Sequence, residues 1–257
     1  MRLHQLSHAA AVIVVYRAIN PQQVFMDRKD QTHPRVYCRG GYCPIGGNRN
    51  KGRTETGPRA LALAELSEEL TFVRAVRDDA EYKELGTTDA VSQYAATSIS
   101  GVPITTEDVL ALEMLKAKIA RVIRPYGDFI ARIPNHAIRH LEPNWDMARP
   151  IVPYLCSYFE AGLDEQEWKE LTRLQTKFGN LSNESETEIF DLAEAVTRND
   201  HGAFHHGPAM RHWWNKQGLY ELAMRLRMLP GISAEFIGPC SAIWDEYDEE
   251  YEFKNLA

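Results

Sequence analysis

The sequence has 257 residues, with 36 acidic and 29 basic side chains and a formal net charge of −7. This acidic balance argues against a protein that coats nucleic acid, although a local basic segment could still bind a phosphate. Apolar residues make up 44% of the chain, and four cysteines are too few for a disulfide scaffold. No run reaches the roughly 18 apolar residues of a membrane span. We therefore expect a globular cytoplasmic protein without a membrane partner.

The N-terminal part predicts two strands followed by a loop. The β-branched run 9–16 is typical of a buried strand, and residues 23–27 are expected to be its hairpin partner. Residues 36–44 predict a further short strand. The segment 46–57 is rich in Gly, Asn, Arg and Lys and is expected to be a loop.

Helices dominate the prediction after this loop. Residues 58–70 predict a helix, because Pro58 suits a first helical turn and the Ala/Leu/Glu run has high helix propensity. A second helix is expected over 106–124, ended by Pro125. The later elements are expected to be strands at 152–161 and 186–190 and helices at 164–175, 192–196 and 219–229.

Three glutamates share one face of the helix 58–70. At about 100° per residue, Glu65, Glu68 and Glu69 fall within roughly 100° of arc, while the leucines occupy another sector. Carboxylates this close together repel one another. A divalent cation would remove that cost, because Mg²⁺ and Mn²⁺ prefer oxygen ligands. A solvated acidic face is the alternative interpretation.

The segment that leads into this helix favours a phosphate. Gly46 and Gly47 open it, and backbone N–H groups at turns and at a helix N-terminus attract anions. A basic cradle beside an acidic metal cradle suits hydrolysis of a phosphoanhydride. The cationic side chains of this segment are Arg49, Lys51, Arg53 and Arg59.

The segment from Ala64 to Phe72, Ala-Glu-Leu-Ser-Glu-Glu-Leu-Thr-Phe, resembles the core of the Nudix box, Arg-Glu-U-x-Glu-Glu-x-Gly-U, where U is apolar. Gly46-Gly47 resembles the glycines that open the box. The resemblance implies a Nudix-like α/β/α sandwich with a mixed sheet. We expect a single domain over residues 1–257, with a largely helical insertion at about 77–150.

The same resemblance implies an activity. Nudix proteins hydrolyse the pyrophosphate bond of a nucleoside diphosphate linked to another group, with Mg²⁺ or Mn²⁺ as cofactor. Glu65, Glu68 and Glu69 would be the metal ligands. The sequence departs from the pattern at Ala64 in place of Arg and at Thr71 in place of Gly. These departures affect the residues that would stabilise the arrangement of loop and helix, and they leave the metal-binding carboxylates in place.

Hydrolysis also needs a base that activates water. Glu69 and Glu186 are our candidates, with Glu184 and Glu188 as alternatives, and a set of surface charges at a strand end is the competing interpretation. The candidate substrate-binding residues are Arg39, Arg49, Lys51 and Arg53.

Two other clusters have competing interpretations. Cys38 and Cys43 could be half of a zinc site, but no second Cys or His pair follows at a suitable interval, which favours two small residues beside a turn. The second cluster predicts a loop whose side chains pack together, with a nucleobase contact or a metal site as alternatives. It consists of His201, His205, His206, His212, Trp213 and Trp214.

The expected substrate is a nucleotide-type small molecule, such as ADP-ribose, a dinucleotide or a capped nucleotide; capped RNA is less favoured. The insertion is placed to shape the pocket or to form a homodimer contact. One alternative function is a catalytically inactive Nudix-like module that binds a nucleotide or a protein. Another is an unrelated interaction protein whose acidic helix is only solvated.

Overall fold

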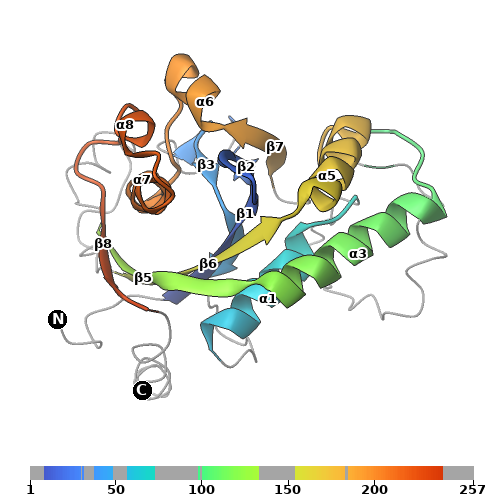
Figure 1. Ribbon diagram of the computed structural model, residues 1–257, viewed down its shortest axis with the longest axis horizontal. Coiled ribbons are helices and arrows are strands. Elements are labelled where there is room, and N and C mark those ends of the chain that lie inside the picture. The colour runs from blue at the N-terminus through green and yellow to red at the C-terminus, as the bar shows by residue number, and fades with distance from the viewer. Residues whose placement is uncertain are drawn as a thin grey trace.

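The computed structural model describes residues 9–29, 31, 38–48, 57–72, 98, 100–132, 154–182 and 185–239. They form a mixed sheet with helices on both faces (Figure 1), which confirms the expected α/β class with a mixed sheet. In chain order the elements are β1 (Ala9–Arg17), β2 (Asn20–Arg28), β3 (Tyr42–Cys43), β4 (Ile45–Asn48), α1 (Pro58–Glu69), α3 (Thr106–Val122), β5 (Arg124–Arg132), β6 (Tyr154–Leu163), α5 (Glu165–Phe178), β7 (Glu186–Asp191), α6 (Leu192–Arg198), α7 (His206–Lys216), α8 (Tyr220–Ala223) and β8 (Ser233–Gly238).

The sheet has the strand order β3-β2-β1-β6-β5-β8, with β7 also paired to β2 and β4 also paired to β1. Strands β1 and β6 run parallel, whereas the other pairs are antiparallel. Strand β1 changes partner along one edge: Ala10–Ile13 pair with β4, and Val15–Arg17 pair with β2. The sheet therefore forks, meaning that β1 and β2 separate beyond their paired residues. In this fork β4 pairs with β1 and β3 pairs with β2.

Strand β1 is buried on both faces. Ala10, Val12 and Val14 belong to one hydrophobic cluster, and Ala11, Ile13 and Val15 belong to another on the opposite face. Because side chains alternate along a strand and both faces are covered, the sequence of β1 is a continuous apolar run rather than an alternating one.

Helices α1, α3 and α5 cover the face of Ala11 and Ile13, and α6, α7 and α8 cover the face of Val12 (Figure 1). Trp168 of α5 lies in the first cluster, and Trp213 of α7 lies in the second. Each layer therefore has its own core, and the side chains of one sheet face do not meet those of the other.

Side-chain caps fix helices α3 and α5, which share a face of the sheet with α1. Helices α3 and α5 both begin with a capping box, and Gly179 in the left-handed conformation ends α5. Two cations of α5 bind Asp108, which belongs to the capping box of α3: Arg173 lies 3.2 Å from its carboxylate, and Lys177 lies 2.5 Å from it. These ion pairs connect α5 and α3 on the face of the sheet that carries α1.

Several local expectations were wrong. Residues 46–48 belong to β4 rather than to a loop, because β1 pairs with them. Within 77–150, α3 is the predicted helix, but 124–132 form β5, which lies inside the sheet between β6 and β8. Residues 73–97, 99 and 133–153 lie outside the described residues, so the extent of an insertion stays a prediction.

The C-terminal part also differs from the prediction. Part of the His/Trp cluster forms helix α7 instead of a loop, and the helix expected at 219–229 is only Tyr220–Ala223 long. Strand β8 was not predicted; its pairing with β5 defines it. No helix in the described part of the chain has the length and apolar character needed to cross a membrane.

Candidate active site

Helix α1 lies over the fork of the sheet, directly after the segment that follows β4. Leu61, Ala62 and Leu66 are fully buried and pack α1 on the sheet. Glu65 and Glu69 are also buried, whereas Glu68 is exposed. The three glutamates therefore share a helix face only in part: two turn inwards and one faces solvent.

Gly46 and Gly47 of β4 make room for the two buried carboxylates. A β-carbon on Gly47 would lie 2.5 Å from Oε1 of Glu65, so no larger residue fits there while Glu65 keeps its position. The backbone N–H of Gly46 donates a hydrogen bond to Oε2 of Glu69 at 3.0 Å. Adjacent residues of one strand thus contact both carboxylates, which places them side by side.

Gly46 has a second constraint, from its own backbone. Its φ of 146° is a conformation that L side chains rarely adopt, and a β-carbon would lie 2.6 Å from the Cα of Val12. The two glycines quoted for the family resemblance therefore have separate roles: Gly46 allows β4 to approach β1, and Gly47 admits Glu65.

A third buried carboxylate lies on the same face of the sheet. Asp27 is 1% exposed and follows Phe25 by two residues, on the side where α1 packs. The hydroxyl of Ser185 donates to it. Sequence analysis missed Asp27, although an acidic residue two positions after a buried Phe on a strand was a usable signal.

The pKa of the Cys43 thiol responds to the charged groups of this region. Burial raises its pKa to about 12; Lys29 acts to lower it, and Asp27 and Glu69 act to raise it. Cys43 is therefore a protonated thiol at neutral pH, unsuited to act as a nucleophile. Within the described ranges, no group of three or more His, Cys, Asp and Glu residues is arranged to hold a metal ion, so the zinc alternative gains no support.

The predicted cations are only partly accounted for. Arg49, Lys51 and Arg53 lie outside the described residues, and their role stays a prediction. Arg39 is partly buried beside the turn at 38–41. Arg59 donates to the carbonyl oxygen of Ala120 at 2.9 Å, so it links α1 to α3.

Glu186 is not brought together with the carboxylates of α1. It opens β7, is exposed, and shares its strand face with Glu188 and Phe190. Phe190 packs in the core beneath α7, on the opposite side of the sheet from α1. Glu188 is bound to Arg28 at 2.7 Å, and Glu184 lies outside the described residues. The sheet thus separates Glu186 from Glu65.

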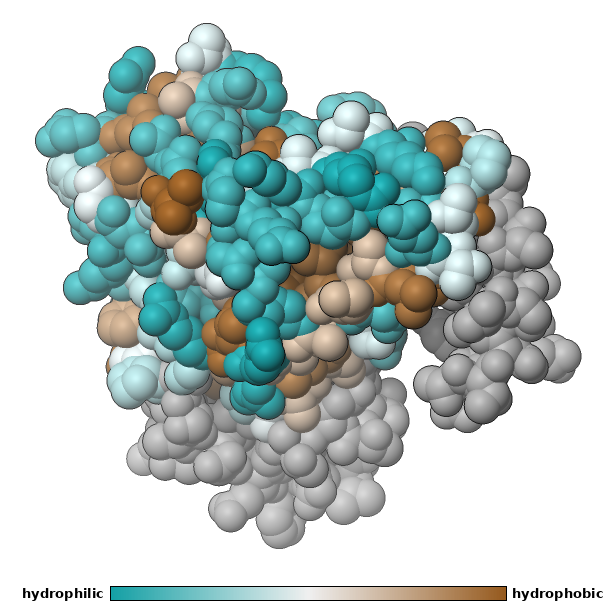
Figure 2. Space-filling view, turned by 45° about the vertical axis from the view of Figure 1, so that its right-hand side comes forward, coloured by the Kyte–Doolittle hydropathy of each residue, from teal (hydrophilic) through white to brown (hydrophobic). Residues whose placement is uncertain are grey.

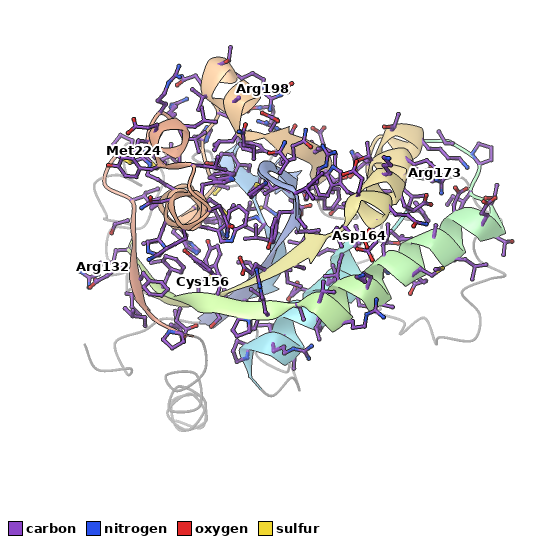
Figure 3. All side chains as sticks on the ribbon, in the orientation of Figure 1. Arg132, Cys156, Asp164, Arg173, Arg198 and Met224 are labelled. Carbon is purple, nitrogen blue, oxygen red and sulfur yellow. The ribbon has the colours of Figure 1, made fainter. Side chains whose placement is uncertain are left out.

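The His/Trp cluster packs in the second core, as the favoured interpretation predicted. Trp213 and Trp214 are fully buried, and their indole N–H groups donate to Glu160 and to the carbonyl oxygen of Pro21. His206 is bound to the hydroxyl of Tyr158 at 2.6 Å. These contacts fix α7 to the sheet face that also carries Cys156 (Figure 3).

A scan of protein-family models and a search of curated proteins give no match. Among solved structures, the chain is similar to a NUDIX hydrolase from Alicyclobacillus acidocaldarius, with 16% identity, a TM-score of 0.34, and coverage of 74% of this chain and 82% of that one. The chain is also similar to the mMutator MutT protein from Bacillus halodurans, with 12% identity, a TM-score of 0.36, and coverage of 83% of this chain and 82% of that one.

A third similar structure is the E. coli dihydroneopterin triphosphate pyrophosphohydrolase, with 14% identity, a TM-score of 0.31, and coverage of 84% of this chain and 94% of that one. Similarity at these TM-scores says nothing by itself about activity. The function of this chain has to be inferred from its own residues.

Proposed function

We propose that the chain is a metal-dependent hydrolase that cleaves the pyrophosphate bond of a nucleoside diphosphate-linked substrate. The observation that carries the proposal is the pair of carboxylates, Glu65 and Glu69, buried side by side against Gly46 and Gly47. Glu68, one helical turn from Glu65, is exposed, and within the described ranges the three glutamates do not form a ready-made three-residue metal group, so the proposal rests on the buried pair.

Two neighbouring buried carboxylates are costly for a fold. Removing an ion from water costs several kcal/mol even after the protein relaxes, and like charges add repulsion. One backbone N–H, from Gly46, offsets part of that cost for Glu69. A bound divalent cation would lower this cost further, because it prefers carboxylate oxygens as ligands.

The donor set fits Mg²⁺ or Mn²⁺. It consists of hard carboxylate oxygens, and Mg²⁺ is usually held by one or two carboxylates together with water and substrate phosphates. Glu65 and Glu69 would supply one or two of these ligands, and water and substrate phosphates would supply the others. When bound, the ion would neutralise the diphosphate and make a water molecule more acidic.

In this proposal the residues of the chain position the ion and the substrate phosphates, and none of them forms a covalent bond to the substrate. Glu65 and Glu69 would hold the ion, and the N–H of Gly46 orients Glu69. This hydrogen bond favours Glu69 as a ligand over Glu69 as the base. Arg49, Lys51 and Arg53, which follow Gly47 in the sequence, are proposed to bind the phosphates. Glu186 has no place in this arrangement.

The test is hydrolysis of a substrate panel with and without Mg²⁺, comprising ADP-ribose, dinucleotides, dinucleoside polyphosphates, capped RNA and nucleoside triphosphates. We expect Glu65→Gln and Glu69→Gln to lower kcat/KM by about 10²-fold or more, since each removes a charged ligand. Glu186→Gln is the matched control and should retain activity. Wild-type activity in both α1 variants would exclude this mechanism.

The panel also separates the alternative function. A binding module would be stabilised against heat by one of these ligands without turning it over, with or without Mg²⁺. Turnover that depends on Mg²⁺ would rule that alternative out.

A further inference from the structure

Helix α3 carries a regular row of exposed side chains on its outer side. The row has the 3-4-3-4 spacing that keeps residues on one face of a helix that pairs with another helix. Two of its members are large apolar residues: Leu110 is 59% exposed and Met114 is 72% exposed. The outer row consists of Glu107, Leu110, Met114, Ala117 and Arg121.

The other sides of α3 are already in contact with the rest of the chain. Leu112, Leu115 and Ile119 are buried beneath the helix. On one flank Ala120 accepts from Arg59 of α1, and on the other Lys118 forms an ion pair with Glu167 of α5. Within the described part of the chain, the outer row is therefore the exposed face of α3. Figure 2, which turns the right-hand side of Figure 1 forward, shows hydrophobic residues interspersed among hydrophilic ones on the visible face of the molecule.

The charges at the ends of the row indicate what covers it. Glu107 lies in the first turn of α3 and Arg121 in the last, and neither forms an ion pair within the described part of the chain. A second α3 packed antiparallel about Met114 would place Glu107 opposite Arg121 of the partner subunit. Leu110 would meet Ala117 of the partner subunit. A parallel pair would instead place like charges opposite each other.

We propose that the outer row of α3 is a homodimer interface, in which two copies of the chain pair their α3 helices antiparallel about a two-fold axis near Met114. A two-fold axis requires a surface to be complementary to itself, and the row meets this condition in both charge and apolar character. One pair of helices buries an area at the low end of specific interfaces, so the dimer is reversible and concentration-dependent. The proposal does not depend on the proposed activity.

The first experiment is sedimentation velocity of the full chain over a wide range of concentrations. The wild type should shift from monomer to dimer as concentration rises. Met114→Glu places two carboxylates at the axis and should leave a monomer at every concentration. Ile19→Glu is the matched control, since Ile19 is an equally exposed apolar residue in the β1–β2 turn, 70% exposed. A monomeric wild type, or equal dimerisation of Met114→Glu, would overturn the proposal.

The second experiment tests the antiparallel arrangement through its charges. Glu107→Arg and Arg121→Glu each create two repulsive contacts per dimer and should raise the dimer Kd by about tenfold. The double variant Glu107→Arg/Arg121→Glu restores opposite charges across the axis and should return Kd close to wild type. Failure of the double variant to recover would contradict this arrangement, and a circular-dichroism melt verifies that each variant is folded.

Discussion

Oε1 of Glu65 lies 2.5 Å from the position that a β-carbon on Gly47 would occupy, so the carboxylate fills the space that the glycine leaves open. Helix α1 and strand β4 can approach this closely only because no side chain stands between them. The consequence is a carboxyl group held at a fixed place in a largely apolar layer, near Glu69.

The substitution Gly47→Ala should displace the carboxylate of Glu65 without unfolding the chain. We expect at least a tenfold loss of kcat/KM, because a ligand moved by about 1 Å no longer fits its site. Steady-state kinetics with Mg²⁺ measures this loss. Gly207→Ala, on the other side of the sheet, is the control: its β-carbon would lie 3.3 Å from the flexible Met228 Sδ and at ordinary contact distances of 3.6 and 3.7 Å from the Gly202 backbone. Equal effects of the two substitutions would refute the special role of Gly47.

Divalent ions should stabilise the wild type. Differential scanning fluorimetry should show Tm rising with Mg²⁺ concentration, since an ion that binds only the folded state adds RT ln(1 + [L]/Kd) to its stability. The double variant Glu65→Gln/Glu69→Gln should be more stable than the wild type without Mg²⁺, because it removes two buried charges, and should not respond to Mg²⁺. Glu221→Gln, on exposed α8, should behave like the wild type. A Mg²⁺ response retained in the double variant would place the ion elsewhere.

The capping residue Asp108 should contribute to stability only above acidic pH. Burial alone would raise its pKa, but hydrogen bonds from Lys177, Thr105 and Arg173 outweigh that effect and hold the pKa well below its usual range. An aspartate whose pKa is lowered by folding stabilises the protein above its unfolded pKa of about 3.9, and this stability is lost as pH falls towards the folded pKa. Asp108→Asn should therefore lower the free energy of unfolding by about 2 kcal/mol at pH 7.

Urea denaturation at several pH values tests this expectation. The difference between Asp108→Asn and the wild type should shrink below about pH 4. Glu113→Gln, an exposed position of the same helix, should change stability by only a few tenths of a kcal/mol, as is typical of surface ion pairs. A difference that stays constant with pH would mean that packing, rather than charge, explains the effect.

The buried His206 should make the fold sensitive to mild acid. Burial lowers its pKa well below the ordinary value, and His205 and Lys29 act in the same direction. The unfolded chain binds a proton below about pH 6.5 that the folded chain does not, so stability should fall as pH drops, by at most about 1.4 kcal/mol per pH unit.

The variant His206→Gln should show a shallower decline of stability between pH 7 and pH 5. Tyr158→Phe removes the hydroxyl bound to His206 but keeps the buried imidazole, so it should lower stability at pH 7 while retaining the slope. Parallel pH profiles of His206→Gln and the wild type would show that another group titrates in this range.

Local sequence patterns determined β1, β2, α1, α3 and α5. The apolar run of β1 needs no partner to be recognised as a buried strand, and Thr105 and Asp164 mark the starts of α3 and α5 through their caps. The shared face of the α1 glutamates follows equally from the period of a helix.

Only the tertiary structure decided the strands that lack such a pattern. The segment Arg124–Arg132 contains Pro, Gly and Asp, and it is a strand because β6 and β8 pair with it on either side. Pairing across long sequence separations adds hydrogen bonds that no local window contains, so β4, β5 and β8 could not be predicted from their own residues.

The candidate site divides in the same way. The sequence by itself determined that Glu65, Glu68 and Glu69 share a helix face and that two glycines precede them. The tertiary structure decided that β4 buries Glu65 and Glu69 but leaves Glu68 exposed, that Asp27 lies on the same face, and that Glu186 lies on the other. The reason is physical. The helical repeat determines which side chains of α1 point in the same direction, but only the strand that packs against the helix determines which of them are buried.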